Sequence, residues 1–364
     1  MDISLVMAVY NNLSYTKNCY NRIRDIYPEA PIVISSGGST DGTLEWLQSL
    51  DDENLSFIHD DDKLSFSSNT NAGIKLVDTE KLVLIHNDMV IGKNFLENLS
   101  ELMDEKTLLS YSHIEPPIYK GPRPGKVLMD LGEGFEDFKY EQFENYVDSV
   151  KDKKELYNGG TILTSGYKKL FEDVGYLDGF SFDPVFCEDD DFLIRTKLKG
   201  YNLKYTNCAV VYHMVSRTSR GLMSNETKLY EHRSQRNFIR KWGLQVPVFF
   251  ELRYWEDQVF TYKTFTMGLT TNSRKYLYTL EPFFDKINIG TIPEDYLENE
   301  EPNTNYDIRS KFVLTDAVDV MIYEVSPFTE EDLYVINKIR LSIPHYDVGE
   351  YQIGNMSIDI RKKV

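Results

Sequence analysis

The sequence predicts an α/β protein built on a largely parallel sheet with helices on both faces. Strand-like and helix-like segments alternate through the first hundred residues, a pattern typical of crossover connections between parallel strands. Polar clusters follow several of these strands, at the sheet edge where ligands bind. The 364 residues, 41% of them apolar, suffice for one large domain with a smaller one, or for two medium domains.

The expected elements of the first part follow in chain order. Short apolar or β-branched runs predict strands at Ile3–Val9, Pro31–Ser35, Leu55–His59 and Lys81–His86. Helical patterns between and after them predict helices at Ser14–Ile26, with Ser14 as the N-cap, and at Thr43–Leu50, Ser65–Leu76 and Asn94–Met103. The polar clusters at strand ends are Tyr10-Asn11, Ser36–Asp41 and His86–Asp88.

The later part of the chain is less regular. Leu109–Tyr157 is rich in Pro, Gly and acidic residues and predicts an irregular insert. Regular elements are then expected as strands at Gly159–Thr164 and Leu203–Val211, and as helices at Gly166–Val174, Asp189–Gly200 and Ser224–Trp242. Beyond Gly243 we expect a helical aromatic stretch at Val246–Tyr278, a linker at Asn288–Asp307 and a small β-containing module at Tyr306–Val364. The predicted domains are residues 1–223 and a C-terminal mixed α/β extension, residues 224–364.

Composition excludes some classes of function. The formal net charge of −18 argues against a general nucleic-acid-binding protein, which would present a basic face. Three widely spaced cysteines form no zinc pattern or disulfide framework, which fits a reducing cytoplasm. The N-terminus opens on a strand-like run without a cleavable signal, and no apolar stretch approaches the ~18 residues of a membrane span. We therefore expect a soluble cytoplasmic protein.

Three groups of residues are candidates for chemistry. Asp88 ends a buried strand, where a carboxylate must be paired or bound to a cation, although an aspartate there is also a common helix cap or turn residue. The run Glu188–Asp191 is either a solvated first turn of a helix or the source of a partly buried general base. His213 ends a β-branched strand, and its imidazole is either a structural side chain or a metal ligand.

Seven segments in this order resemble the family 2 glycosyltransferases, which have the GT-A fold. The resemblance covers about residues 3–220 and rests on the segments Met7-Ala8-Val9-Tyr10-Asn11, Ser36–Thr43, Thr70–Ile74, Asn87-Asp88, Gly159–Leu163, Glu188–Asp191 and Val211–His213. The family counterparts are a Pro-x-Tyr-Asn turn, an Asp-Asp-Gly-Ser-x-Asp-Gly-Thr loop, an Arg-Asn-x-Gly helix, a metal motif ending in Asn-Asp, a Gly-Gly-x-x-Leu strand, a Glu-Asp-x-Asp motif and a Val-x-His strand end.

The resemblance implies an inverting transfer of a sugar from a nucleotide-diphosphate sugar, a UDP-sugar foremost, to a hydroxyl of a glycan or other acceptor. Asp88 and His213 would bind Mn²⁺ or Mg²⁺, Asp189 would be the general base, and Glu188 would shape the catalytic site. The donor would be bound by Tyr10, Asn11, Ser36, Gly37, Asp41, Asn71, Asn87 and Arg217. The acceptor side would include Gly159, Gly160 and Asp191, with Asp191 alternatively capping its helix.

Three departures from the family pattern concern the donor and the metal. Ser36 and Gly37 replace the aspartates that usually contact base and ribose, and Thr70 replaces an arginine. His86 stands where the metal motif usually begins with Asp, which makes Asp88 and His213 the expected protein ligands rather than the tripeptide His86–Asp88 as a unit.

Other functions stay open at this point. One is a catalytically inactive relative that binds sugars or a partner, which the altered donor loop favours. Another is glycosylation of a nucleic-acid acceptor through the basic helix Lys228–Lys241. A nucleotidyltransferase would need a Lys- and Gly-rich phosphate loop, which the N-terminal region lacks. The C-terminal region could pack on the catalytic domain, contact the acceptor or form a homo-oligomer.

Overall fold

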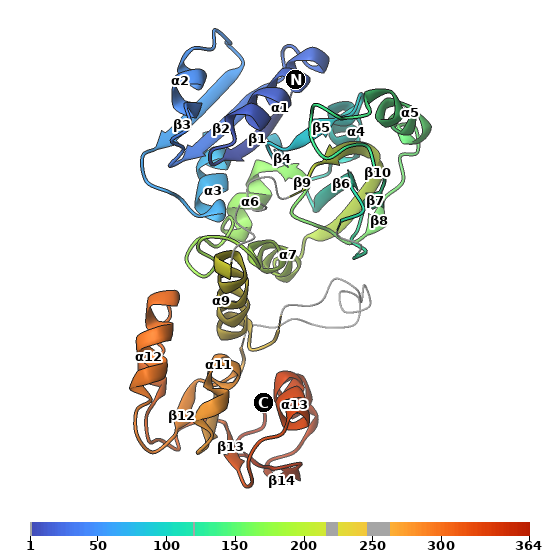
Figure 1. The fold of residues 1–364 in the computed structure, drawn as a ribbon. Helices are drawn as coiled ribbons and strands as arrows, with labels where there is room; N and C mark the ends of the chain where they lie inside the picture. Colours follow the sequence, from blue (N-terminus) through green and yellow to red (C-terminus); the bar gives the residue numbers. More distant parts are fainter. Residues whose placement is uncertain (1, 119–120, 216–224, 246–262) are drawn as a thin grey trace. The chain divides into compact units, whose positions relative to one another are not determined.

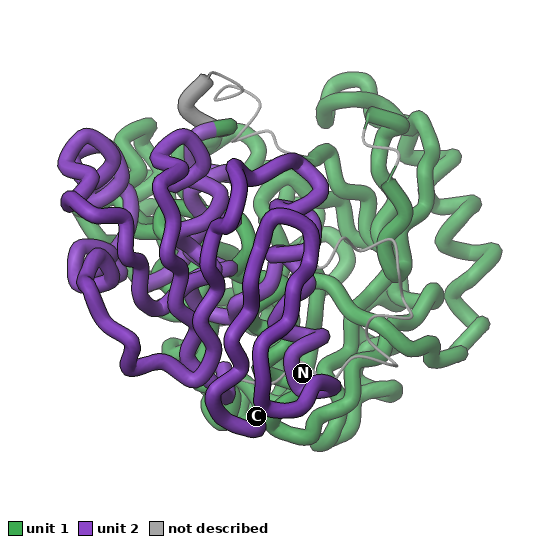
Figure 2. The backbone as a smooth tube through the Cα atoms, turned by 90° about the horizontal axis from the view of Figure 1, so that it is seen from below, with its two compact units in different colours: residues 1–179, 183–228, 247–259 green, residues 180–182, 229–246, 260–364 purple. Residues whose placement is uncertain are grey.

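The computed structural model describes residues 2–118, 121–215, 225–245 and 263–364, and these residues form a mixed α/β protein. The chain divides into two compact units (Figures 1 and 2). Unit 1 consists of residues 1–179, 183–228 and 247–259, and unit 2 of residues 180–182, 229–246 and 260–364. No helix among the described residues is long and apolar enough to cross a membrane.

Unit 1 is built on one sheet, in which ten strands are seen among the described residues. These strands are β1 (Ile3–Val9), β2 (Ile32–Gly37), β3 (Leu55–Asp60), β4 (Lys81–Ile85), β5 (Met89–Ile91), β6 (Thr107–Glu115), β7 (Lys126–Leu128), β8 (Tyr157–Asn158), β9 (Thr164–Tyr167) and β10 (Asn202–His213). Their order is β3-β2-β1-β4-β9-β6-β10-β5, with β7 paired to β6 and β8 to β10.

The helices of unit 1 cover both faces of this sheet. They are α1 (Leu13–Ile26), α2 (Thr43–Gln48), α3 (Phe66–Leu76), α4 (Phe95–Leu102), α5 (Tyr140–Val150), α6 (Lys168–Val174) and α7 (Glu188–Leu198). Leu5 packs in a core with Ile23 of α1 and Leu99 of α4, whereas its neighbour Val6 packs with Phe171 of α6 on the other face. Successive strand residues point to opposite faces, so β1 is buried on both sides, as in a sheet sandwiched between helices.

Most of the sheet has the predicted parallel arrangement, because β6 also pairs in parallel with β10 and with β7. Strands β3, β2, β1 and β4 are parallel neighbours, with Leu5 of β1 opposite both Ile32 of β2 and Val83 of β4. Strand β9 then runs antiparallel to β4 and β6, and β5 and β8 run antiparallel to β10. The α/β class, the flanking helices and the largely parallel sheet are confirmed, with β5, β8 and β9 as its antiparallel strands.

The region 109–157 was predicted to be irregular, and this was wrong for β6, for the short strand β7 and for α5. Strand β6 is buried along its whole length, but its sequence mixes apolar residues with Ser110, Ser112 and His113, which hid the strand pattern. Its serines are satisfied by backbone carbonyls outside the strand: Ser110 Oγ donates to Thr161 O, and Ser112 Oγ donates to Gly125 O. Helix α5 follows within the same region.

Two further expectations for unit 1 are corrected. The strand expected at Gly159–Thr164 begins only at Thr164, because Gly159 has a φ of 128°, outside the strand region. Helix α1 begins at Leu13 rather than at a Ser14 cap. Its first amide, Leu13 N, donates to Asp41 Oδ2 at 2.8 Å, so a distant carboxylate satisfies a free amide at the helix start.

Unit 2 has its own five-stranded sheet among the described residues, in the order β12-β11-β13-β15-β14. Its strands are β11 (Met267–Thr270), β12 (Lys286–Asn288), β13 (Val320–Glu324), β14 (Gly349–Ile353) and β15 (Met356–Ile360). Its helices include most of α9 (Asn225–Trp242), with α11 (Leu277–Leu280), α12 (Glu294–Glu300) and α13 (Glu330–Ser342), and 3₁₀ turns at Arg274–Tyr276, Glu281–Phe283, Glu301–Asn303, Arg309–Lys311 and Ile343–His345.

The second sheet confirms the expected β-containing module. Two expectations for the segments that precede this module are corrected. Residues 246–262 of the expected aromatic helix lie outside the described residues, and the stretch after them contains β11. The expected linker Asn288–Asp307 contains α12. Buried charges explain this ordered acidic segment: Arg240 contacts Glu281 at 2.6 Å and Glu300 at 2.7 Å, and Lys311 contacts Glu281 at 2.5 Å. Paired in this way, acidic residues can occupy the interior.

Candidate functional site

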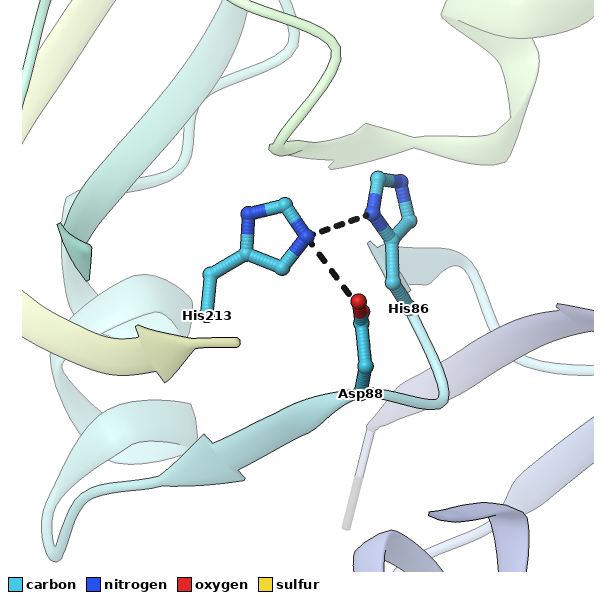
Figure 3. Close-up of side chains that lie close together, drawn as sticks. All are labelled: His86, Asp88 and His213. Atoms are coloured by element: carbon cyan, nitrogen blue, oxygen red, sulfur yellow. Dashed lines mark hydrogen bonds and ion pairs between the residues drawn. The ribbon is translucent and has the colours of Figure 1, made fainter. Parts of the chain in front are cut away.

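Three side chains converge at the carboxyl end of β4: His86, Asp88 and His213 (Figure 3). His86 and Asp88 lie in the short connection between β4 and β5, and His213 is the last residue of β10. Strand β10 pairs antiparallel with β5, which places His213 opposite Met89. The next amide, Met214 N, donates to Asp88 O at 3.0 Å. Backbone hydrogen bonds therefore hold together residues that are 125 positions apart in the chain.

The spacing of the three side chains fits one small divalent cation. His213 Nε2 lies 3.3 Å from Asp88 Oδ1 and 3.4 Å from His86 Nδ1, and the ligand atoms all lie within 4.8 Å of one another. Ligand atoms bound at about 2.0–2.2 Å to one ion lie about 3–3.5 Å apart. Among the described residues, this is the one group of His, Cys and acidic side chains found in such an arrangement.

The electrostatics of this group also suit a cation. Burial alone would lower the pKa of His213, but the carboxylates of Asp88 and Glu115 outweigh it and raise that pKa to about 9. Burial, together with the positive charge of His213, lowers the pKa of His86 to about 4. The protein thus already concentrates one positive charge at this point, on a proton that a metal ion would replace.

Glu115, at the end of β6, lies directly behind His213 and was not singled out by the sequence. Its Oε1 is 3.3 Å from His213 Nδ1 and 3.7 Å from His113 Nε2, and its Oε2 is 2.7 Å from Lys126 Nζ. Burial alone would raise the pKa of Glu115, but contact with His213, His113 and Lys126 lowers it to about 2. An ionised carboxylate on Nδ1 directs the other ring nitrogen, Nε2, toward Asp88, as carboxylates behind metal-binding histidines do.

The predicted donor loop is held against the end of β1. Asn11 has a left-handed backbone with a φ of 54°. Its N–H donates to Ser39 Oγ at 2.9 Å, and its Oδ1 accepts from Thr40 N at 2.8 Å. Tyr10 follows β1 directly, with Lys63 Nζ 4.7 Å from its ring centroid. The structure therefore brings Tyr10, Asn11 and the loop Ser36–Asp41 to neighbouring strand ends, as predicted.

Local packing explains the two unusual residues of this loop. Ser36 is 1% exposed, and its Oγ lies 3.1 Å from His59 Nδ1. A Cβ on Gly37 would lie 2.9 Å from Leu64 Cβ, which leaves no room for a carboxylate side chain without rearrangement. Asp41, in turn, accepts hydrogen bonds from Leu13 N and from Thr43 Oγ1. The loop that the family uses for base and ribose contacts is thus largely engaged with the protein itself.

Two asparagines of the predicted donor site also have partners within the protein. The amide of Asn71 spans the backbone of Leu177, donating to its O at 2.8 Å and accepting from its N at 3.0 Å. Asn87 is buried and donates to Thr16 Oγ1 at 3.1 Å. These contacts give both side chains a structural role. Arg217, the remaining donor candidate, lies outside the described residues.

The four acidic residues of the first turn of α7 have different surroundings. Asp191 is fully buried and binds Arg195 Nε at 2.8 Å, a structural ion pair within the helix. Glu188 and Asp190 are also buried. Each has one carboxylate oxygen without a hydrogen-bond partner among the described residues. Burial, reinforced by the neighbouring carboxylate of Asp189, raises the pKa of both.

Asp189 is the half-buried member of this run. Burial raises its pKa above the ordinary aspartate value, while the positive charge of Arg123 opposes that shift. Its partial exposure distinguishes it from the fully buried, ion-paired Asp191. Gly160, predicted on the acceptor side, packs against this helix: a Cβ there would lie 3.2 Å from Leu193 Cδ2.

Residues 4–160 match the family model described as glycosyl transferase family 2. This region contains the donor loop, His86 and Asp88, and it ends before α7 and His213. No curated protein matches the chain at a significant level.

Several solved structures are similar in part. GalNAc-T7 with UDP, GalNAc and Mn²⁺ is 12% identical, with a TM-score of 0.44, over 58% of this chain and 42% of that one. Staphylococcus aureus TarS 1–349 in complex with UDP-GlcNAc is 16% identical, with a TM-score of 0.44, over 66% of this chain and 67% of that one. The mannosyltransferase PcManGT from Pyrobaculum calidifontis, in complex with GDP-Man and Mn²⁺, is 16% identical, with a TM-score of 0.45, over 70% and 68%. This chain spans less than half the length of GalNAc-T7.

With TM-scores below 0.5, these likenesses assign no substrate. The family match rests on the sequence of the N-terminal region and agrees with the α/β sheet and its strand-end loops. Residues 4–160 therefore belong to glycosyl transferase family 2, and the chain carries a glycosyltransferase domain.

Proposed function

We propose that this protein transfers a sugar from a nucleotide-diphosphate sugar to an acceptor hydroxyl, with a divalent metal ion and with inversion at the anomeric carbon. The observation that carries the proposal is the meeting of Asp88 and His213 at the carboxyl end of β4, beside the donor loop of a family 2 domain. This sheet edge is where α/β proteins bind nucleotides.

Asp88 and His213 would hold the metal ion, which when bound supplies positive charge to the leaving nucleoside diphosphate. Asp88 contributes a hard carboxylate oxygen, and His213 contributes Nε2, oriented by Glu115 behind it. The buried position of Asp88 supports this role, because an ionised carboxylate that is 5% exposed requires a cationic partner.

Asp189 is the proposed general base. Its carboxylate would accept the proton of the acceptor hydroxyl while that oxygen bonds to the anomeric carbon and the carbon–phosphate oxygen bond breaks. Attack from the face opposite the leaving diphosphate inverts the configuration. The raised pKa of Asp189 supports this role, because a base works best when its pKa approaches the working pH. Glu188 and Asp191 would shape the site around it.

The residues that would contact the nucleobase of the donor differ from the family pattern. Ser36 contacts His59, and Gly37 packs against Leu64, so the usual aspartate contacts to uridine are replaced. Thermal-shift measurements with UDP, GDP, CDP and ADP, each with and without Mn²⁺, will identify the base, because a bound ligand raises apparent stability. We expect a shift that requires Mn²⁺ and that is lost in Asp88→Ala but retained in Asp61→Ala, an exposed acidic control.

Asp189 and its neighbour Asp190 provide a matched test of the general base. We expect Asp189→Asn to reduce sugar transfer by about 10²- to 10⁴-fold while leaving Mn²⁺-dependent nucleotide binding intact. The control is Asp190→Asn, one residue along the same helix turn, which should retain most of the activity. Near-normal turnover in Asp189→Asn would show that another group takes the proton.

The altered donor loop also favours a second candidate, a binding protein that has lost catalysis. The same measurements distinguish the two. Nucleotide-sugar binding without hydrolysis or transfer for any common donor would support the binding protein, and transfer by the wild-type chain would exclude it.

A further inference from the structure

The connection between β4 and β5 carries a histidine where the family pattern has an aspartate, and this histidine points into the candidate metal centre (Figure 3). We infer that His86 is a third protein ligand, and that the two imidazoles make this centre prefer Mn²⁺, Co²⁺ or Zn²⁺ to Mg²⁺. The inference deepens the proposed function and depends on it for the presence of a divalent ion at Asp88 and His213.

The distances favour a shared ion over a chain of hydrogen bonds. His213 Nε2 faces two atoms, Asp88 Oδ1 at 3.3 Å and His86 Nδ1 at 3.4 Å. Both separations exceed the usual 2.7–3.2 Å of N–H hydrogen bonds, and one N–H cannot point at both atoms. Two ligands at about 2.0–2.1 Å in tetrahedral geometry lie about 3.3–3.4 Å apart. These two separations therefore match ligands placed around a common centre, and all three ligand atoms lie within 4.8 Å of one another.

Packing holds the His86 ring in this position. Its centroid lies 5.7 Å from that of Phe66 and 5.2 Å from that of His213, both in edge-to-face arrangements. Since neighbouring rings fix the imidazole, little side-chain entropy is lost when it binds an ion. A surface histidine that met His213 by chance would lack this support from both sides.

The ligand set determines which ion fits best. Imidazole nitrogen suits Zn²⁺, Ni²⁺ and similar borderline ions, whereas carboxylate, carbonyl and water oxygens suit Mg²⁺ and Ca²⁺, with Mn²⁺ in between. Mg²⁺ also prefers to keep several of its waters. Asp88 together with the two imidazoles of His86 and His213 leaves positions for diphosphate oxygens and favours the borderline ions. An aspartate in place of His86 would shift the ion preference of this ligand set toward Mg²⁺.

Metal titrations of the full chain test this inference without measuring transfer. Isothermal titration with Co²⁺, Zn²⁺, Mn²⁺ and Mg²⁺ should give wild-type Co²⁺ affinity well above Mg²⁺ affinity, and the visible spectrum of bound Co²⁺ should indicate nitrogen ligands. His86→Ala should weaken Co²⁺ binding by at least the ~10- to 100-fold that loss of an outer group costs, with Mg²⁺ binding little changed. His86→Asp should reduce the difference between the affinities for Co²⁺ and Mg²⁺. The control is His345→Ala, an exposed histidine in unit 2.

Asp88→Ala separates this inference from the proposed function. Loss of Co²⁺ binding in Asp88→Ala, with unchanged affinity and spectrum in His86→Ala, would overturn the third ligand and leave the proposed metal site standing. Unchanged Co²⁺ binding in both variants would overturn the metal site altogether. If His86→Ala fails to fold, as judged by circular dichroism, His86→Asp provides the same test. A smaller difference between its Co²⁺ and Mg²⁺ affinities than in wild type would support a third ligand at His86, and an unchanged difference would refute it.

Discussion

Replacing Glu115 by Gln perturbs the candidate metal centre without removing a ligand. The two carboxylate oxygens have different partners: Oε1 faces His213 Nδ1 at 3.3 Å, and Oε2 faces Lys126 Nζ at 2.7 Å. Both Glu115 and Lys126 side chains are 4% exposed, so neither partner is exchanged for water. A lysine ammonium only donates hydrogen bonds, so the single oxygen of the substituted amide should stay with Lys126.

The amide NH₂ of the Glu115→Gln variant would then face His213 Nδ1, which must become an acceptor. In the wild-type chain an ion replaces the proton on Nε2, which faces Asp88, while Nδ1–H keeps donating to Glu115. In the variant, an ion on Nε2 would leave the Nδ1 proton facing the amide NH₂, which cannot accept it. Changes behind metal-binding histidines lower affinity about 10- to 100-fold, which corresponds to about 1.4–2.7 kcal/mol. We expect a loss of this size for Co²⁺ and Mn²⁺ in isothermal titration.

Nitrogen-15 NMR of the His213 ring will report the tautomer directly, and a purely structural role for Glu115 would leave it unchanged. The double variant Glu115→Gln/Lys126→Met frees the amide to turn its oxygen toward His213 and should recover most of the affinity. Metal binding as tight as wild type in Glu115→Gln, or weaker binding in the double variant than in the single one, would exclude this role for Glu115.

Three further predictions concern other parts of the molecule. Asn71→Ala should lower the free energy of unfolding by about 1–3 kcal/mol, because it leaves the Leu177 backbone unpaired, and a large loss of nucleotide affinity at unchanged stability would instead make Asn71 a donor ligand. Phe171→Ala should lower stability by about 3–5 kcal/mol in urea unfolding, because the ring is fully buried and stacks on Phe192 with centroids 5.4 Å apart; a loss below 1 kcal/mol would contradict this packing. Lys311 and Arg240 hold the pKa of Glu281 at about 2, against an ordinary 4.5, despite its burial. The ionised Glu281 therefore contributes its full share to the free energy of unfolding above about pH 4.5, and this share disappears as the pH falls toward 2. Unfolding midpoints at pH 6 and pH 3 should therefore differ less in Glu281→Gln than in wild type, and equal differences would exclude this role.

The sequence predicted the local elements of unit 1 better than their assembly. Strand β1 was predicted with its observed bounds, because a run of seven apolar or small residues between polar neighbours has one plausible structure. Strand β6 was missed, because serines and a histidine interrupt its pattern, and Ser110 is satisfied by a carbonyl distant in the sequence. Such contacts depend on tertiary structure and leave no local signal.

The same limit applies to the candidate site. Asp88 and His213 could be singled out because Asp88 closely follows one hydrophobic strand and His213 ends another, and the structure brings them together. Glu115 lies at the end of the missed strand, so its place behind His213 could not be foreseen. His86 was set aside because it departs from the family pattern, yet its ring points into the centre. A one-residue change in a motif can keep the position of a ligand and alter its chemistry.

The hydrogen bond from Met214 N to Asp88 O has a consequence for how an ion would enter and leave. It joins the two ligand-bearing segments at the inner end of β10, where His213 also pairs with Met89. Although β5 is the last strand of the sheet order, Met89 and Met214 are fully buried, and amides in such buried segments exchange their hydrogens chiefly when the domain opens. The backbone of the two ligand-bearing segments would therefore stay hydrogen-bonded during turnover. The residence time of the ion would then depend on exchange of its water and diphosphate oxygens rather than on local unfolding of the protein.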